Sequence, residues 1–272
     1  MNVLDLASFT ERMRASRESF AAATPFPHLS LDGFLPEATA DALVAEFGDG
    51  SIAWRHLHHV NERKQVFGDR SRMGPVASRV VDELQSPPFL RALEELTGVE
   101  GLTPDPDLDG AGLQQTGPGG HLNVHADALA HTKRRSWSRQ LNLILFLNRD
   151  WDDAYCGWLE LWDANVERCV QRIAPTFNRC VLFRTSAISF HGVPEGVACP
   201  PGRTRKSLAL YYFRDEGRVL RLEPTRYRPR PADSVARRAL IHADRGLVAL
   251  YSLLKRYTPL DDARASRLLR RL

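Results

Sequence analysis

Two histidines and one aspartate have the residue types and spacing of a metal site. His125 and Asp127 are two residues apart, so on a β-strand their side chains emerge on the same face. His191 follows near the end of another predicted strand. Two imidazoles and one carboxylate leave other coordination positions open, which suits ferrous iron that must also bind a cosubstrate and dioxygen. The three residues therefore predict an iron site, although an H-x-D triplet alone has low specificity.

An arginine and a serine indicate an anion site beside these ligands. Arg205 and Ser207 begin a strongly apolar predicted strand and share one of its faces. A guanidinium there can hold the distal carboxylate of a dicarboxylate through two hydrogen bonds, helped by the hydroxyl. The alternative is an arginine in a surface ion pair, which would contribute little energy.

Three further side chains have two interpretations each. Asn142 faces the same side of its predicted strand as Ile144, and is either a hydrogen-bonded core amide or a cosubstrate contact. His121 is expected to share a strand face with His125 and is a candidate for contacting substrate, and less so for binding metal. Trp158 is a candidate substrate contact, or else packs at the barrel mouth.

The elements that must position these groups are mainly helices at first and strands later. Hydrophobic spacing predicts a short strand and several helices, the last one ended by Gly98; the strand covers 28–31 and the helices 3–21, 35–47, 75–84 and 88–97. Residues 50–75 are polar and irregular, and their histidines, His56, His58 and His59, are expected to be solvated loop residues and not a zinc site.

Short strands dominate the second half of the chain. Apolar runs separated by turn signals predict strands over 140–148, 158–162, 170–173, 179–183 and 207–213. A Gly-, Pro- and Asp-rich connection, 101–120, leads into them. Many short strands at this spacing favour an antiparallel barrel or jelly roll over a parallel sheet with crossover helices.

Composition limits the class of protein. Of 272 residues 43% are apolar and 26% charged, which excludes a disordered, collagen-like or coiled-coil chain. No apolar run approaches the ~20 residues of a membrane span. The N-terminus lacks the apolar segment of a secretory signal, so a cytoplasmic location is expected. The four cysteines form no C-x-x-C pair and are expected to be reduced.

The positive charge gathers at the C-terminal end. Residues 216–272 contain 14 Lys/Arg and 6 Asp/Glu, a balance of 14 − 6 = +8, whereas the net charge of the whole chain is +4. This pattern is typical of a solvated helical face, or of contact with an acidic partner. Nucleic acid is not favoured, because no basic block with interleaved aromatic residues is present.

The stretch from Gly119 to Arg214 resembles the iron- and 2-oxoglutarate-dependent dioxygenases of the prolyl 4-hydroxylase type. The phrases that carry the resemblance are Leu122-Asn-Val-His-Ala-Asp127, Arg139-Gln-Leu-Asn-Leu-Ile-Leu-Phe-Leu-Asn148, Leu159-Glu-Leu-Trp-Asp163, Phe190-His-Gly192 and Thr204-Arg-Lys-Ser-Leu-Ala-Leu-Tyr-Tyr212. With upstream segments it covers about residues 25–215. Cys156 replaces the first of two usual glycines, and Gln114 stands where a histidine is frequent.

The resemblance implies a mainly β fold with helical additions (α+β): a double-stranded β-helix, or jelly roll, packed by N-terminal and C-terminal helices. It divides the chain into an N-terminal helix (1–24), the dioxygenase domain (25–215) and a basic helical extension (216–272). It implies iron ligands His125, Asp127 and His191, and a 2-oxoglutarate carboxylate bound by Arg205 with Ser207. Asn142 is a further candidate cosubstrate contact.

The implied reaction is hydroxylation of an unactivated C–H bond, coupled to oxidative decarboxylation of 2-oxoglutarate to succinate and carbon dioxide. The cofactors are Fe(II), 2-oxoglutarate and dioxygen, with ascorbate as a stimulant. The presence of Asp127 favours hydroxylation over halogenation. The substrate is expected to be a small molecule, amino acid, peptide or carrier-bound intermediate. The alternative is a non-enzymatic β-helix that binds a small acid or a partner protein, and the C-terminal helices either cover the barrel or form a homodimer.

Overall fold

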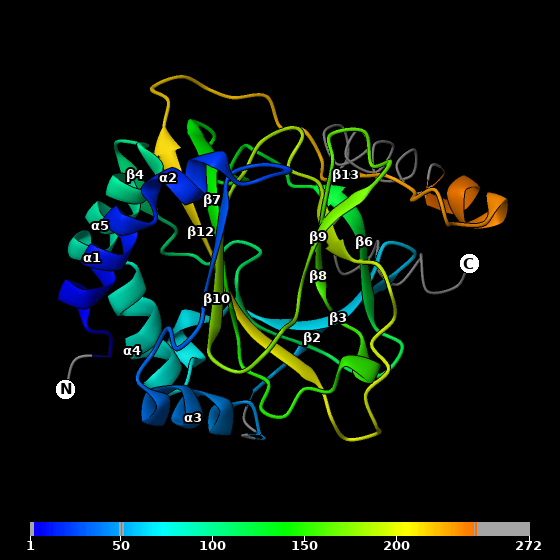
Figure 1. Cartoon of the computed structure of the whole chain (residues 1–272), viewed down its shortest axis with the longest axis horizontal. Coiled ribbons are helices and arrows are strands. Elements are labelled where there is room, and N and C mark those ends of the chain that lie inside the picture. The colour runs from blue at the N-terminus through cyan, green and yellow to red at the C-terminus, as the bar shows by residue number, and fades with distance from the viewer. Residues whose placement is uncertain (1–2, 49, 51, 242, 244–272) are drawn as a thin grey trace.

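Strands form most of the molecule and helices cover one side of it (Figure 1). The computed structural model describes residues 3–48, 50, 52–241 and 243. Within these residues, strands β1 to β13 join in one antiparallel sheet that curls into a jelly roll. The predicted mainly β fold with helical additions is therefore confirmed.

Helices α1 to α5 all precede strand β4 in the sequence. The predicted helix over 3–21 is two helices, because the chain breaks at Ser16; the later helices agree with the predictions, and Gly98 ends the last one at φ 68°. Their bounds are α1 Leu6–Ala15, α2 Arg17–Ala22, α3 Glu37–Glu46, α4 Pro75–Leu84 and α5 Pro87–Thr97. Two single 3-10 turns are η1 Arg70–Arg72 and η2 Asp153–Tyr155.

The strands pair mostly with strands distant in sequence. Their bounds are β1 His28–Leu31, β2 Arg55–His59, β3 Glu62–Phe67, β4 Leu102–Pro104, β5 Gly112–Thr116, β6 His121–Ala126, β7 Trp137–Phe146, β8 Leu159–Trp162, β9 Cys169–Ile173, β10 Arg179–Arg184, β11 His191–Val193, β12 Arg205–Asp215 and β13 Arg226–Tyr227. The order along the sheet is β1-β10-β7-β12-β5-β3-β6-β11-β8-β9, with β2 on β3, β4 on β12 and β13 on β6.

Strand β7 shows how the sequence separates the outside of the barrel from its interior. Leu141, Leu143 and Leu145 are buried between the sheet and the helices α1, α4 and α5. The alternate residues Asn142 and Ile144 point into the barrel, as strand periodicity requires. The interior face of this strand therefore carries both polar and apolar side chains.

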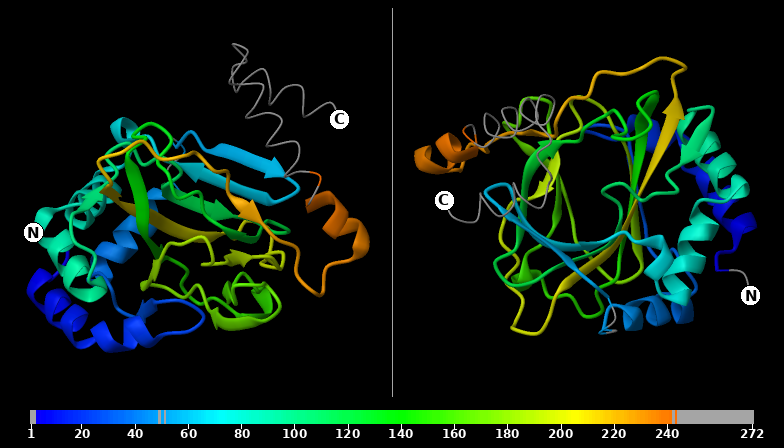
Figure 2. Two further views of the ribbon diagram at one scale, coloured as in Figure 1. Left: turned by 90° about the horizontal axis from the view of Figure 1, so that it is seen from above. Right: turned by 180° about the vertical axis from the view of Figure 1, so that it is seen from behind.

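One region differs from the prediction. Residues 50–75 were expected to be a loop, but β2 and β3 form a hairpin, with His56 opposite Gln65 and His58 opposite Arg63. The hydrophobic pattern missed it because few of its residues are apolar. It is held by backbone pairing of β3 with β5 and β6, and it lies beside these strands in Figure 2. Strands β4 and β5 likewise lie in the stretch predicted as a connection.

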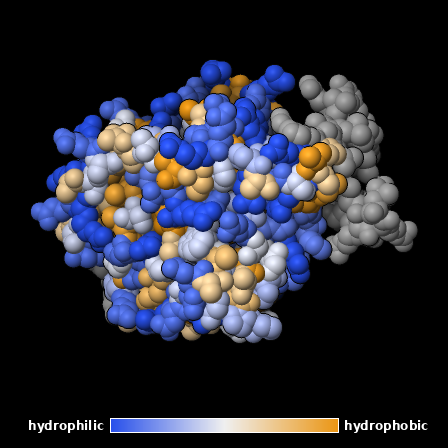
Figure 3. All heavy atoms as spheres, turned by 45° about the vertical axis from the view of Figure 1, so that its right-hand side comes forward, coloured by the Kyte–Doolittle hydropathy of each residue, from blue (hydrophilic) through white to orange (hydrophobic). Residues whose placement is uncertain are grey.

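After β12 the chain crosses the barrel to β13, and residues 235–241 are helical (Figure 1). The rest of the predicted basic helical extension, residues 242 and 244–272, lies outside the described residues. The face in Figure 3 is mostly polar, with apolar residues in small separate patches. No helix in the described part of the chain is long and apolar enough to cross a membrane.

Candidate active site

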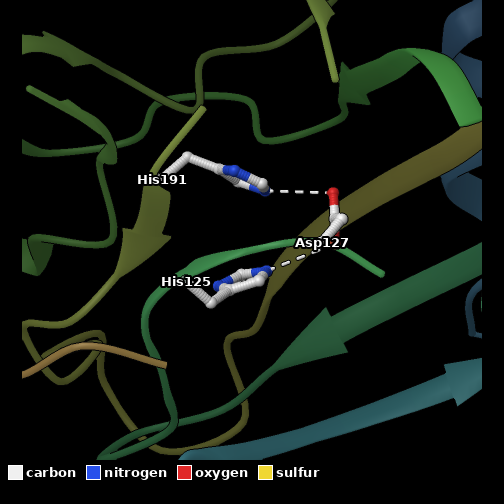
Figure 4. A group of neighbouring side chains, drawn as sticks. All are labelled: His125, Asp127 and His191. Carbon is white, nitrogen blue, oxygen red and sulfur yellow. Dashed lines mark ion pairs between the residues drawn. The ribbon is translucent and has the colours of Figure 1, made fainter. Parts of the chain in front are cut away.

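Strands β6 and β11 bring the three predicted ligands together (Figure 4). His191 on β11 lies directly opposite His125 on β6, and Asp127 follows the end of β6. The Nε2 atoms of His125 and His191 lie 3.5 and 3.7 Å from the two carboxylate oxygens of Asp127. One ligand atom from each residue fits within 4.8 Å of the others, so all three can contact one ion.

Backbone carbonyls fix the orientation of both imidazoles. Nδ1 of His125 donates to the carbonyl of Asn123 at 2.9 Å, and Nδ1 of His191 donates to the carbonyl of Ser189 at 3.0 Å. A neutral imidazole with a protonated Nδ1 has a lone pair on Nε2. Both lone pairs then face a carboxylate, which is repulsive unless a cation lies between them. The donor set therefore fits a divalent metal, and carbonyl partners on Nδ1 are typical of metal-binding histidines.

The protonation states agree with metal binding. Burial, helped by the neighbouring His125, lowers the pKa of His191 to about 4, so its ring is neutral near pH 7. Burial alone would raise the pKa of the Asp127 carboxyl, but the charge of Arg139 and the contacts with His125 and His191 together outweigh burial and hold that pKa well below its usual range. A neutral imidazole and an ionised carboxylate are the forms that ligate metals.

Arg205 is a buried cation in the same pocket. Its guanidinium lies over the Phe146 ring at 4.8 Å, and its Nε donates to the carbonyl of Gly157 at 2.6 Å. Among the described residues, no carboxylate lies within 4.0 Å of it, and burial lowers its pKa to about 10. A buried charge without a counterion is costly. An anionic ligand in the pocket would offset that cost.

The pocket that holds these groups has a volume of about 560 Å³. Arg205, Ser207, Ala209 and Tyr211 all line it, because alternate residues of β12 face the interior. His125, Asp127, His191 and Asn142 line it as well. The structure thus places the predicted metal ligands and the predicted anion site in one cavity.

Asn142 and Arg139 both contact the carboxylate of Asp127. The Asn142 amide donates to Oδ2 at 2.7 Å and accepts from the Thr185 hydroxyl at 3.3 Å. Nη1 of Arg139 lies 3.4 Å from Oδ1, and its guanidinium lies 3.8 Å above the Tyr211 ring. Asn142 therefore supports a predicted ligand directly, and its contact with a cosubstrate stays a prediction.

Sequence reasoning missed Arg139. It is three residues from Asn142, so on a regular strand its side chain would lie on the face opposite to that of Asn142. The pairing of β7 with β12 slips by one residue there: Tyr212 is opposite Leu141, but Phe213 is opposite Arg139. Such a β-bulge reverses the facing of the residues beyond it. No feature of the sequence pattern marks it.

A second irregularity separates His121 from the site. In the pairing of β6 with β11, His191 is opposite His125 but Val193 is opposite Leu122, so β6 has one extra residue there. Leu122 therefore joins the pocket wall, and Nε2 of His121 lies 3.2 Å from the carbonyl of Val60. The expectation that His121 and His125 share a face is wrong. The role of His121 as a substrate contact stays a prediction that this position does not favour.

Trp158 is also kept apart from the metal ligands. Leu159 lines the pocket, whereas the Trp158 ring lies 5.4 Å from the guanidinium of Arg172. Its contact with substrate stays a prediction.

A different acidic group with a histidine lies elsewhere, at Asp105, Asp107 and His131. The Arg134 guanidinium pairs with Asp107 and lies 3.7 Å from Asp105. Backbone N–H groups of Lys133 and Arg134 donate to Nδ1 of His131, and Asp105 accepts two others. These hydrogen bonds hold the loop together. The Arg134 guanidinium already supplies the positive charge that a metal ion would bring to the two carboxylates.

Comparison with known proteins agrees with this geometry. Residues 111–213 match the family model of the 2OG-Fe(II) oxygenase superfamily. The chain is also similar to the prolyl 3-hydroxylase OGFOD1 of Mus musculus, with 25% identity over 228 residues, which cover 78% of this chain and 39% of the relative. The chain thus spans about two fifths of that relative's length.

Solved structures show the same fold. A prolyl-4-hydroxylase of Pseudomonas putida gives a TM-score of 0.55 at 18% identity, covering 74% of this chain and 98% of the other. A prolyl hydroxylase of Trichoplax adhaerens, solved with a peptide of hypoxia inducible factor, gives a TM-score of 0.54 at 19% identity. The match covers 78% of this chain and 93% of the other. The segment that matches the family model thus spans the strands that carry His125, Asp127, His191 and Arg205, and the solved structures share the jelly-roll fold.

Proposed function

We propose that this protein is an Fe(II)- and 2-oxoglutarate-dependent hydroxylase. The observation that carries the proposal is the meeting of two oriented imidazoles, one ionised carboxylate and a buried unpaired arginine in a single pocket.

Each of these residues has a defined task. His125, Asp127 and His191 would hold the iron, with Asn142 and Arg139 keeping the Asp127 carboxylate oriented and ionised. Arg205 and Ser207 would bind the distal carboxylate of 2-oxoglutarate. The bound iron, with dioxygen and 2-oxoglutarate, supplies the oxidation: one oxygen atom enters a substrate C–H bond, the other enters succinate, and carbon dioxide is released.

The substrate is proposed to be an aminoacyl side chain, with a prolyl residue in a peptide as the first candidate. The support is the similarity to a prolyl 3-hydroxylase and to the fold of two prolyl hydroxylases. The pocket volume of about 560 Å³ admits such a side chain together with the cosubstrate. We also expect ascorbate to sustain turnover. Cytoplasmic location and a homodimer through the C-terminal helices stay predictions.

Two measurements test the proposal. Anaerobic addition of Fe(II) and 2-oxoglutarate should produce a charge-transfer absorption band, and in air the protein should convert 2-oxoglutarate to succinate slowly. His125→Gln should abolish both, whereas His121→Gln, on the same strand but bonded to Val60, should retain both. Absence of the band in the wild-type protein would refute the proposal. Prolyl peptides, amino acids and carrier-bound acyl groups can then be screened by mass spectrometry for the gain of one oxygen atom.

A further inference from the structure

The C-terminal extension reaches the strand that carries His125. Strand β13 pairs with β6, with Arg226 opposite Ala126 and Tyr227 opposite His125, and the N–H of Arg228 donates to the carbonyl of Val124 at 2.9 Å. On one edge of β6, β11 pairs with His125; on the other edge, β3 pairs only with residues 121 and 122. Strand β13 thus completes the edge that β3 leaves open.

This pairing places an aromatic ring beside a predicted metal ligand. Residues directly opposite in an antiparallel pair project on the same face. His125 therefore lies between two cross-strand neighbours, His191 at 4.4 Å and Tyr227 at 5.4 Å between ring centroids. Tyr227 and Thr225 also line the pocket. Part of the pocket wall thus comes from outside the segment that matches the family model.

Basic residues of the extension attach it to the barrel. The guanidiniums of Arg226 and Arg228 lie 5.7 and 5.0 Å from the ring of Phe190, the residue before His191. The Arg226 guanidinium also donates to the carbonyl of Ala187. These arginines face away from the pocket because they alternate with Tyr227 along the strand. Part of the positive charge at this end of the chain therefore serves to dock the extension.

A further contact links the extension to the orientation of His125. Nη2 of Arg237 donates to Oδ1 of Asn123 at 2.8 Å, and the carbonyl of Asn123 accepts from Nδ1 of His125. The amide of Asn123 also donates to Asn61 at 3.0 Å, in the turn of the β2–β3 hairpin, which lies next to the extension in Figure 2. The extension, the hairpin and the ligand strand thus meet at one residue.

We propose that residues 225–237 of the C-terminal extension are part of the active site, where Tyr227 positions His125 and bounds the substrate pocket. The hydrogen bond to Asn123 fixes one edge of the imidazole, and the rings of His191 and Tyr227 limit its rotation from either side. Removing the Tyr227 ring frees the imidazole and enlarges the pocket beside it. The part of this inference that concerns iron and substrate rests on the proposed function.

The first test uses the metal-free protein. The His125 ring signals in an NMR spectrum are identified by their loss in His125→Gln, and compared in Tyr227→Ala, Tyr227→Phe and Tyr155→Ala. Tyr155 is a matched control, since its ring packs on Trp151 at 5.5 Å and it does not line the pocket. We expect Tyr227→Ala to shift the His125 signals and Tyr227→Phe to leave them near the wild-type positions. Equal signals in Tyr227→Ala and Tyr155→Ala would overturn the inference.

The second test is anaerobic titration with Fe(II) in the presence of 2-oxoglutarate. Loss of a residue that orients a metal ligand typically weakens metal binding by about 10- to 100-fold. We expect Tyr227→Ala to show a loss of that order and Tyr227→Phe and Tyr155→Ala a change below about twofold. Wild-type protein without an iron band would contradict the proposed function, whereas an iron band equally strong in Tyr227→Ala would contradict only the role of Tyr227.

Discussion

The side-chain amide of Asn142 donates a 2.7 Å hydrogen bond to Oδ2 of Asp127, and both residues line the same pocket. The amide oxygen of Asn142 is itself held by the hydroxyl of Thr185. The amide cannot rotate without losing both bonds, so the carboxylate is presented to His125 and His191 in one orientation. Oxygen atoms already aimed at the metal need no reordering when it binds.

Replacing Asn142 by alanine should therefore weaken iron binding without unfolding the protein. We expect a loss of about 10-fold or more in the affinity for Fe(II), measured by anaerobic titration with 2-oxoglutarate present. Thr185→Val is the control, since it removes only the hydrogen bond from the Thr185 hydroxyl to the Asn142 amide oxygen. It should reduce the affinity for Fe(II) much less. An Asn142→Ala protein that binds iron as tightly as Thr185→Val would contradict this role.

Arg205 should have opposite effects on ligand binding and on stability. Arg205→Met removes a buried charge that has no counterion, and keeping such a charge away from water destabilises the ligand-free fold. We expect the ligand-free variant to melt at the same or a higher temperature than the wild type. With a divalent metal present at the same concentration in both samples, added 2-oxoglutarate should raise the melting temperature of the wild type much more than that of the variant.

The same variant should need far more 2-oxoglutarate for turnover. Losing one partner of a buried charged contact costs about 2 kcal/mol or more, which is about 30-fold in affinity. The measurement is the concentration of 2-oxoglutarate that gives half-maximal succinate formation. An unchanged value in Arg205→Met would show that the cosubstrate carboxylate binds elsewhere.

The sequence predicted the parts of the site that depend on regular periodicity. His125 with Asp127, and Arg205 with Ser207, are two residues apart on or beside regular strands, and each pair lines the pocket as expected. The period-two rule failed at the two bulges, so Arg139 was missed and His121 was wrongly placed on the face of His125. A bulge depends on pairing between distant strands, which no local pattern encodes.

The β2–β3 hairpin and strand β13 were missed for a related reason. β2 and β3 are mostly polar, and β13 has two residues, so neither has a hydrophobic period that marks a strand. Both owe their structure to backbone pairing with β6 or β5. The contact of Tyr227 with His125 thus follows from tertiary pairing. The sequence showed the excess of basic residues in this segment but not where they lie.

Glu62 should make the hairpin sensitive to acid. Burial alone would raise the pKa of this carboxyl, but a 2.9 Å contact with His59 and the charge of Lys64 outweigh burial and lower the pKa to about 2. A lowered pKa stabilises the fold fully above the unfolded value of about 4.5, and this contribution is lost as the pH falls toward 2. The upper limit is about 3 kcal/mol.

The test compares urea unfolding at pH values between about 5 and 3. Glu62→Gln should lose stability near pH 5 and should depend less on pH than the wild type. Glu18→Gln, an exposed position on α2, should follow the wild-type curve. If Glu62→Gln kept the full acid dependence of the wild type, the carboxylate of Glu62 would not be its source.

Cys156 occupies a backbone conformation that favours glycine. Its φ is 54° and its ψ −139°, a region where a side chain costs about 1 to 3 kcal/mol. Glycine adopts this conformation without the steric cost, although it gives back about 0.5 to 1 kcal/mol through the greater freedom of the unfolded chain. We therefore expect Cys156→Gly to raise the unfolding free energy by about 1 kcal/mol.

Cys156→Ala separates the backbone effect from loss of the thiol. Alanine retains the Cβ atom and hence the strain, so this variant should not gain stability. Both proteins can be compared with the wild type by urea unfolding under reducing conditions. An equal gain in the two variants would assign the effect to the thiol, which lies 3.8 Å from the carbonyl of Ala154. A gain only in Cys156→Gly would show that the cysteine replaces a glycine at a cost in stability, in the turn next to the Gly157 carbonyl that holds Arg205.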